Sequence, residues 1–214
     1  MIRQLKPWAY GPFEILLHAE LHYRIGEDFD RRIAMIGFDN AIEVAITTYL
    51  RLHPIQRDNK QYPSADVDRW LNNYHTKVDF FFRECVARQV AVVGKHDEII
   101  WYHDVRNGQY HGGGATVPQR RELDGVRAAA LEVFAVLFEV ADADAQLDAH
   151  ISAMQNAPQP RTDGGDRLID GKFGLIELCG QLEYSSELLY AVDPNRYHDT
   201  IQNLENGAET EDPS

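Results

Sequence analysis

This chain of 214 residues has little cysteine and little positive charge. Its 21 Lys and Arg stand against 34 Asp and Glu, which gives a formal net charge of −13. Clustered Lys and Arg normally bind phosphate groups. The charge therefore argues against an indiscriminate nucleic-acid binder and leaves room for a local basic site. The two cysteines, Cys85 and Cys179, lie in apolar helical contexts, which favours two buried thiols over a disulfide.

Long hydrophobic runs are also missing. No run approaches eighteen apolar residues, so we expect no membrane span. The first residues lack the apolar core of a signal peptide, so we expect a cytoplasmic protein. The length suits one domain, or one domain with an appendage.

Apolar spacing predicts an all-α fold, an antiparallel helical bundle with a C-terminal, mostly helical extension. An N-terminal helix within residues 1–27 packs on a bundle of residues 28–142. The expected helices are Pro12–Arg24 ending at Gly26, Asp28–Leu52 ending before Pro54, one long helix capped by Ser64 with an apolar stripe from Val67 to Val86, a short helix Asp97–Val105, and Gln119–Val140 after a capping box of Thr116 and Gln119.

The remainder of the chain is expected to be an appendage. Residues 155–166 are predicted to be a linker and residues 167–200 an extension. Within the extension, a hairpin turning at Asp170-Gly171 competes with a helix, and a helix over Leu182–Val192 ends at Pro194. Residues 201–214 are acidic and are predicted to be disordered.

Polar residues follow one line along the apolar second helix. Asp39, Glu43 and Thr47 are each four apart, with Asn40 beside them. Such a stripe is either a solvated edge or the wall of a site, and the sequence favours neither. His18 and His22 are also four apart, but no further metal ligand accompanies them, so ordinary packing is the preferred interpretation and no metal is expected.

The segment most indicative of chemistry is Arg106-Asn107-Gly108-Gln109-Tyr110-His111. Gly108 is expected to end the preceding helix, so that His111 can return toward Arg106. An Arg followed by a His four to six residues later occurs twice, as often as chance predicts. The other pair, Arg69 and His75, is expected to lie on separate faces of an unbroken helix.

The motif, together with the order of helices over residues 28–140, resembles the HEPN superfamily. That resemblance implies a metal-independent RNA endonuclease of toxin or antiviral-defence type, without a cofactor. Arg106, His111 and Asn107 would be its catalytic residues, with Glu43, His103 and Tyr110 in support. It also implies a homodimer that brings two motifs into one cleft, and an antitoxin or regulatory protein as a further partner.

The chemistry suits these residue types. When the 2′-hydroxyl of RNA attacks the adjacent phosphate, one group takes a proton and another gives one, and histidine can do either near neutral pH. Arginine can hold phosphate oxygens while negative charge develops.

Other interpretations remain open. Arg106 and His111 would have a purely structural role if they cap helix ends or pair with carboxylates such as Asp104. The chain would then be a non-catalytic dimerisation or partner-binding module, or a nucleotide-binding regulator. Some toxins of the superfamily have Tyr two residues after the His; here Gly113 stands there, which puts membership of that subgroup in doubt.

Overall fold

A computed structural model describes residues 5–111, 116–155 and 159–209, without the side chains of residues 110, 111, 155 and 207–209. These residues form ten α-helices, two short 3-10 helices and one two-stranded hairpin, which confirms the predicted all-α class. The chain divides into two compact units, residues 1–153 and 154–214. Of the predicted linker 155–166, residue 155 ends one helix and residues 163–166 begin another.

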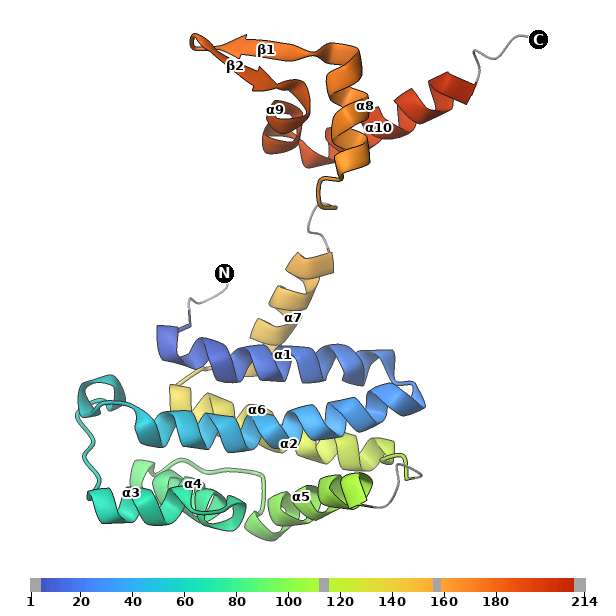
Figure 1. Ribbon diagram of the computed structural model, residues 1–214. Helices are drawn as coiled ribbons and strands as arrows, with labels where there is room; N and C mark the ends of the chain where they lie inside the picture. Colours follow the sequence, from blue (N-terminus) through green and yellow to red (C-terminus); the bar gives the residue numbers. More distant parts are fainter. Residues whose placement is uncertain (1–4, 112–115, 156–158, 210–214) are drawn as a thin grey trace. The chain divides into compact units, whose positions relative to one another are not determined.

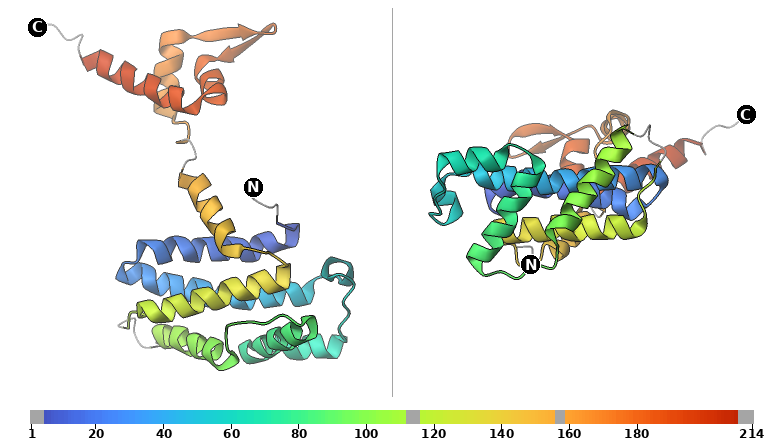
Figure 2. Two further views of the ribbon diagram at one scale, coloured as in Figure 1. Left: turned by 180° about the vertical axis from the view of Figure 1, so that it is seen from behind. Right: turned by 90° about the horizontal axis from the view of Figure 1, so that it is seen from below.

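Two long helices open the first unit. After a 3-10 turn, η1 (Pro7–Ala9), α1 spans Tyr10–Ile25 and ends at Gly26, whose φ of 78° suits glycine. The predicted second helix is confirmed as α2 (Asp28–Arg51). The two helices lie side by side (Figures 1 and 2). Their approach is close, since a Cβ on Gly37 would stand 2.8 Å from the Cβ of Ala19.

Helix α2 is the central helix of the first unit. It packs against α1, α4, α5 and α6, and ten of its residues are buried. By length and composition it is the one described helix that could cross a membrane, but 56% of its most apolar 18-residue stretch is buried inside the protein. Such burial is typical of the central helix of a bundle.

The predicted long third helix is wrong. After η2 (Pro54–Arg57), two helices occupy its place, α3 (Ser64–Leu71) and α4 (Tyr74–Arg88). Asn73 causes the restart, because its side chain accepts a hydrogen bond from the backbone N–H of Thr76 at 3.0 Å and caps α4. The apolar residues keep their helical spacing across this break, so the sequence pattern alone does not reveal it.

Helix α5 is longer than the predicted helix Asp97–Val105. It spans His96–His111 without interruption, so Gly108 does not end it. A glycine inside a helix costs only about 1 kcal/mol. Helix α6 spans Arg120–Phe138, and its capping box joins Gln119 and Glu122 instead of Thr116 and Gln119. Seen from below, α5 crosses α2 (Figure 2, right).

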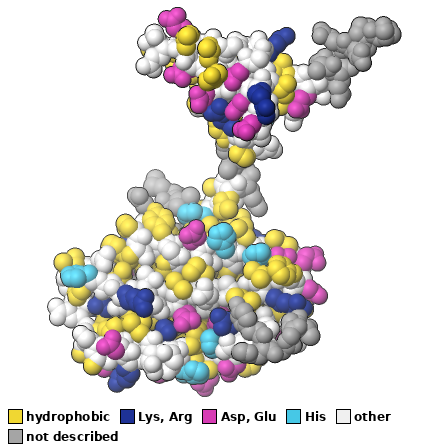
Figure 3. All heavy atoms as spheres, viewed as in Figure 1, with side chains coloured by type: hydrophobic (Ala, Val, Ile, Leu, Met, Phe, Trp, Pro, Cys, Tyr) yellow, Lys and Arg dark blue, Asp and Glu magenta, His cyan; other side chains and the backbone are white. Residues whose placement is uncertain are grey.

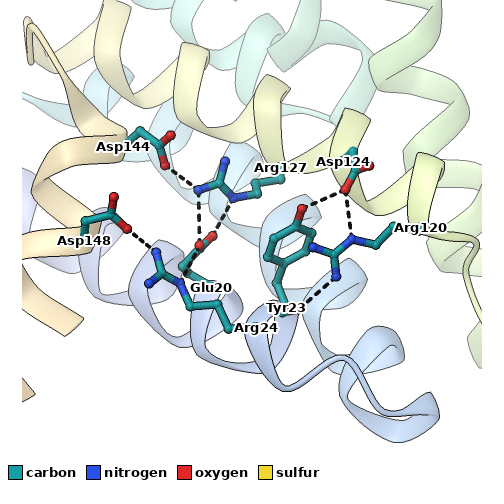
Figure 4. Close-up of polar contacts among 8 residues, drawn as sticks. All are labelled: Glu20, Tyr23, Arg24, Arg120, Asp124, Arg127, Asp144 and Asp148. Atoms are coloured by element: carbon teal, nitrogen blue, oxygen red, sulfur yellow. Dashed lines mark hydrogen bonds and ion pairs between the residues drawn. The ribbon is translucent and has the colours of Figure 1, made fainter. Parts of the chain in front are cut away.

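A further helix, α7 (Ala143–Gln155), has no counterpart in the predicted elements. It buries Ala143, Leu147 and Ile151, which are four apart along one face. A network of ion pairs joins α1, α6 and α7 (Figure 4). At its centre the buried Glu20 accepts hydrogen bonds from Arg24 and Arg127.

The second unit holds the only described strands. Helix α8 (Asp163–Phe173) is followed by β1 (Leu175–Leu178) and β2 (Gln181–Tyr184), an antiparallel pair with Leu175 opposite Tyr184. The hairpin therefore turns at Cys179-Gly180, both with positive φ, and not at Asp170-Gly171. Helix α9 spans Ser185–Val192, and Pro194 begins α10 (Pro194–Glu209). Residues 201–209 are thus helical where disorder was expected.

Candidate functional site

The candidate site lies where α5 crosses α2. Asp39 of α2 is 0% exposed, yet it carries a carboxylate in the middle of an apolar helix. His103 of α5 places its Nδ1 3.1 Å and 3.0 Å from the two oxygens of this carboxylate. The Nε of Arg106, one turn further along α5, lies 3.4 Å from Oδ2 of Asp39. One buried carboxylate therefore holds a histidine and an arginine side by side.

The two nitrogens of His103 lie in different surroundings, because only Nδ1 contacts the Asp39 carboxylate among the hydrogen bonds of the described residues. The nitrogen that faces a carboxylate normally carries the proton, which leaves Nε2 to accept or give one. The His103 side chain is 14% exposed and that of Arg106 is 23% exposed, so both are reachable from solvent. A carboxylate-oriented histidine beside an arginine is suited to proton transfer at a phosphate.

Tyr74, the first residue of α4, stacks on His103. The ring centroids are 3.7 Å apart and the planes differ by 13°. Burial raises the pKa of Tyr74 far above its usual value, and the negative charges of Asp39 and Glu43 raise it further. Tyr74 therefore keeps its proton, and its stacked ring restricts the orientation of the His103 ring.

Asn107 and Glu43 lie at the border of this cluster. The Nη1 of Arg106 donates a hydrogen bond of 2.9 Å to the Oδ1 of Asn107, which orients the guanidinium. Glu43, one turn after Asp39 on α2, forms an ion pair of 3.0 Å with Lys77 of α4. Of the six predicted site residues, the structure thus brings Arg106, Asn107 and His103 together. Glu43 lies one turn from Asp39, the acid that contacts His103 and Arg106.

The predicted partnership of Arg106 and His111 has lost its basis, which was a helix break at Asn107-Gly108. On a continuous helix, residues five apart point about 140° away from each other. The side chains of His111 and Tyr110 lie outside the described residues, and so does Gly113. The histidine that the structure places beside Arg106 is His103.

The other pair, Arg69 and His75, flanks the break between α3 and α4, contrary to the expected unbroken helix. Both side chains are exposed. Arg69 forms an exposed ion pair with Asp66 at 3.0 Å. Neither residue belongs to the cluster at Asp39, so they offer matched controls for mutagenesis.

The sequence alone left the role of the polar stripe on α2 undecided. The burial of Asp39 and its contacts with His103 and Arg106 favour the site wall, while Thr47 is half-buried. Tyr74 was missed. The available signal was an aromatic residue directly after the Asn72-Asn73 pair, at the first position of a helix.

No described group of three or more His, Cys, Asp or Glu side chains is placed to hold a metal ion. Of the two histidines four apart on α1, His22 pairs with Asp30 at 2.7 Å, and His18 is exposed. The comparisons with known proteins add no relative: no family model, no curated protein and no solved structure matches the chain.

Proposed function

We propose that this protein is a metal-independent RNA endonuclease of toxin or antiviral-defence type. The observation that carries the proposal is the buried Asp39 carboxylate, which holds His103 through Nδ1 and Arg106 through Nε. In this proposal His103 takes the proton of the attacking 2′-hydroxyl. Arg106, oriented by Asn107, stabilises the charge on the phosphate, and the products end in a 2′,3′-cyclic phosphate.

The second proton transfer needs a second group. His111 lies eight residues beyond His103, about 12 Å along an α-helix, too far for both side chains of one chain to serve one phosphate. We therefore propose a homodimer in which α5 of each copy lines a shared, solvated groove. Each phosphate then meets Arg106 of one copy and histidines from both. An antitoxin or regulatory protein that covers this groove would control the activity.

A non-catalytic module that binds a partner protein is the second candidate, and it too has support. Arg106 already has a carboxylate partner, so the cluster would also serve simply to fix α5 on α2. Basic and acidic side chains are interspersed on the face of the first unit in Figure 3, without an extended basic surface. The net charge of −13 favours the same interpretation.

Incubation of the purified full chain with total RNA in excess EDTA separates the two candidates. His103→Asn is the sharpest variant, because its amide nitrogen can still donate to Asp39 but cannot transfer a proton. We expect it to slow cleavage by about 10²–10⁴-fold. Arg106→Ala should slow it by about 10²–10³-fold.

The exposed residues His75 and Arg69 provide the controls. His75→Asn and Arg69→Ala should cleave like the parent chain. Unchanged cleavage by His103→Asn would refute the assigned mechanism, as would a monomer at micromolar concentration in light scattering. A stable dimer that cleaves no RNA, with or without EDTA, would refute the nuclease proposal and leave the partner-binding module as the remaining candidate.

A further inference from the structure

The hairpin of the second unit exposes an unusual amount of apolar surface. Five of its eight strand residues are large apolar side chains that are 44–66% exposed: Leu175, Ile176, Leu178, Leu182 and Tyr184. Phe173, just before β1, is 55% exposed. Figure 3 shows hydrophobic and acidic side chains together at this hairpin. The register places Leu175, Leu182 and Tyr184 on one face of the hairpin and Ile176 and Leu178 on the other, because alternate strand residues point to opposite faces. Grouped exposed apolar side chains mark interaction sites, whereas single exposed residues do not.

Both strands have an open edge. Among the described residues β1 and β2 pair only with each other, so the outer N–H and C=O groups of each lack a strand partner. Edge strands are usually protected by lysine, proline or a bulge. The segments Leu175–Leu178 and Gln181–Tyr184 contain no lysine and no proline, and their register is regular. A two-stranded hairpin is only marginally stable in water and gains from a third strand.

A groove beside β1 favours this strand over β2. Its volume is about 320 Å³; its apolar lining comes from Ile169, Phe173, Ile176 and Leu189, and its polar lining from Ser185, Arg196 and Thr200. Since Arg196 is basic, the side chains of an added segment that face this groove should be apolar, and its basic side chains should face away from it. Ile176 belongs to β1, so a segment added along the edge of β1 places alternate side chains on the face of the hairpin that borders the groove. Such a segment gains backbone hydrogen bonds and apolar burial together.

The charge of the second unit identifies the occupant. Residues 154–214 hold twelve Asp and Glu against four Lys and Arg. The only charged residues of the two strands are Glu177 and Glu183. A second copy of this chain would bring two strongly negative units together, and an acidic partner would do the same. A basic segment has the complementary charge.

We infer that β1 binds an extended, basic segment of a partner protein as the third strand of this sheet. Directly opposed side chains stabilise such pairing when apolar meets apolar and opposite charges meet. The segment should therefore carry Lys or Arg opposite Glu177 and apolar residues opposite Leu175, Ile176 and Leu178. This inference does not depend on the proposed nuclease activity, because it concerns the other unit.

Two labelled ten-residue peptides test this inference on the full chain. Both have the apolar pattern just given, and the charged positions are Lys in one and Glu in the other. In fluorescence anisotropy the Lys peptide should bind at least about tenfold more tightly than the Glu peptide. Glu177→Lys should reverse the preference, and Glu183→Lys, the same change on the other strand, should preserve it. Hydrogen exchange should slow at the amides of β1.

Three results would overturn the inference. One is the absence of a preference for the Lys peptide, whether both peptides bind equally well or neither binds at millimolar concentration. Another is a preference for the Lys peptide that Glu177→Lys leaves unchanged. The third is slow exchange of the β1 amides in the chain without peptide at concentrations where it self-associates, which would identify a second copy as the occupant.

Discussion

Replacing Glu20 by Gln should strongly destabilise the first unit. Glu20 is 1% exposed and accepts three hydrogen bonds, from Arg24 Nε at 2.9 Å, Arg127 Nε at 2.6 Å and Arg127 Nη2 at 3.1 Å. The two arginines also pair with Asp148 and Asp144 of α7 (Figure 4). Gln keeps the shape but removes the buried negative charge that both arginines contact.

Breaking a buried ion pair from one side costs roughly 3–5 kcal/mol, because the remaining charge stays without its partner. The Arg24 side chain is 40% exposed, so solvent screens its ion pair with Glu20. The Arg127 side chain is 18% exposed, so loss of its ion pair with Glu20 should account for most of the lost stability. We therefore expect Glu20→Gln to lower the free energy of unfolding by about 3 kcal/mol. Replacing Arg127 by Met in the same chain should restore part of this loss, since it removes the cation that lost its buried partner and kept only the exposed Asp144.

Urea denaturation followed by tryptophan fluorescence is the suitable assay. All three tryptophans, Trp8, Trp70 and Trp101, belong to residues 1–153, so the signal reports the first unit alone. Glu14→Gln is the matched control, because Glu14 is exposed on the same helix and should change stability by less than about 0.5 kcal/mol. A loss below about 1 kcal/mol for Glu20→Gln would show that the network contributes little to stability.

Two further predictions follow from perturbed pKa values. Burial raises the pKa of Glu84, but hydrogen bonds from Lys60, Arg88 and Tyr62 outweigh it and leave the pKa below its usual value. The charged carboxylate thus stabilises the fold above the usual glutamate pKa, and this stabilisation is lost as pH falls through the lowered value. Urea denaturation should show a large loss for Glu84→Gln at pH 7 that shrinks in acid, whereas a loss independent of pH would contradict this. Cys85 is buried with its pKa raised to about 11, while Cys179 is exposed, so a disulfide reagent should label one thiol quickly and the other only on unfolding; two fast thiols would contradict the assigned burial.

Much of the fold of the first unit could be predicted from the sequence. The apolar periodicity of α1, α2 and α6 gave their positions within a few residues, because caps and stop signals such as Gly26 and Pro54 accompany it. Two boundaries failed for opposite reasons. At Asn73 a local cap divided a helix although the apolar stripe ran on, whereas α5 continued through Gly108 despite the local cost of a glycine.

The candidate site was harder to predict. The sequence pointed to Arg106 and Asn107, and it named His103 only as a supporting residue. The decisive partner, Asp39, lies 64 residues before His103 in the chain, and only the crossing of α2 and α5 brings them together. No local pattern distinguishes a carboxylate buried by such a crossing from one at a solvated edge.

The shared carboxylate has a consequence for how descendants of this chain can change. Replacing Asp39 would leave both Arg106 and His103 without their common partner, whereas replacing either of those would leave a buried acid with one contact fewer. Each single change is therefore costly, and the cost falls once the other positions change too. Positions 39, 103 and 106 should therefore be inherited or lost as a set. A retained Asp39 would record how α5 is anchored on α2, whatever chemistry the cluster performs.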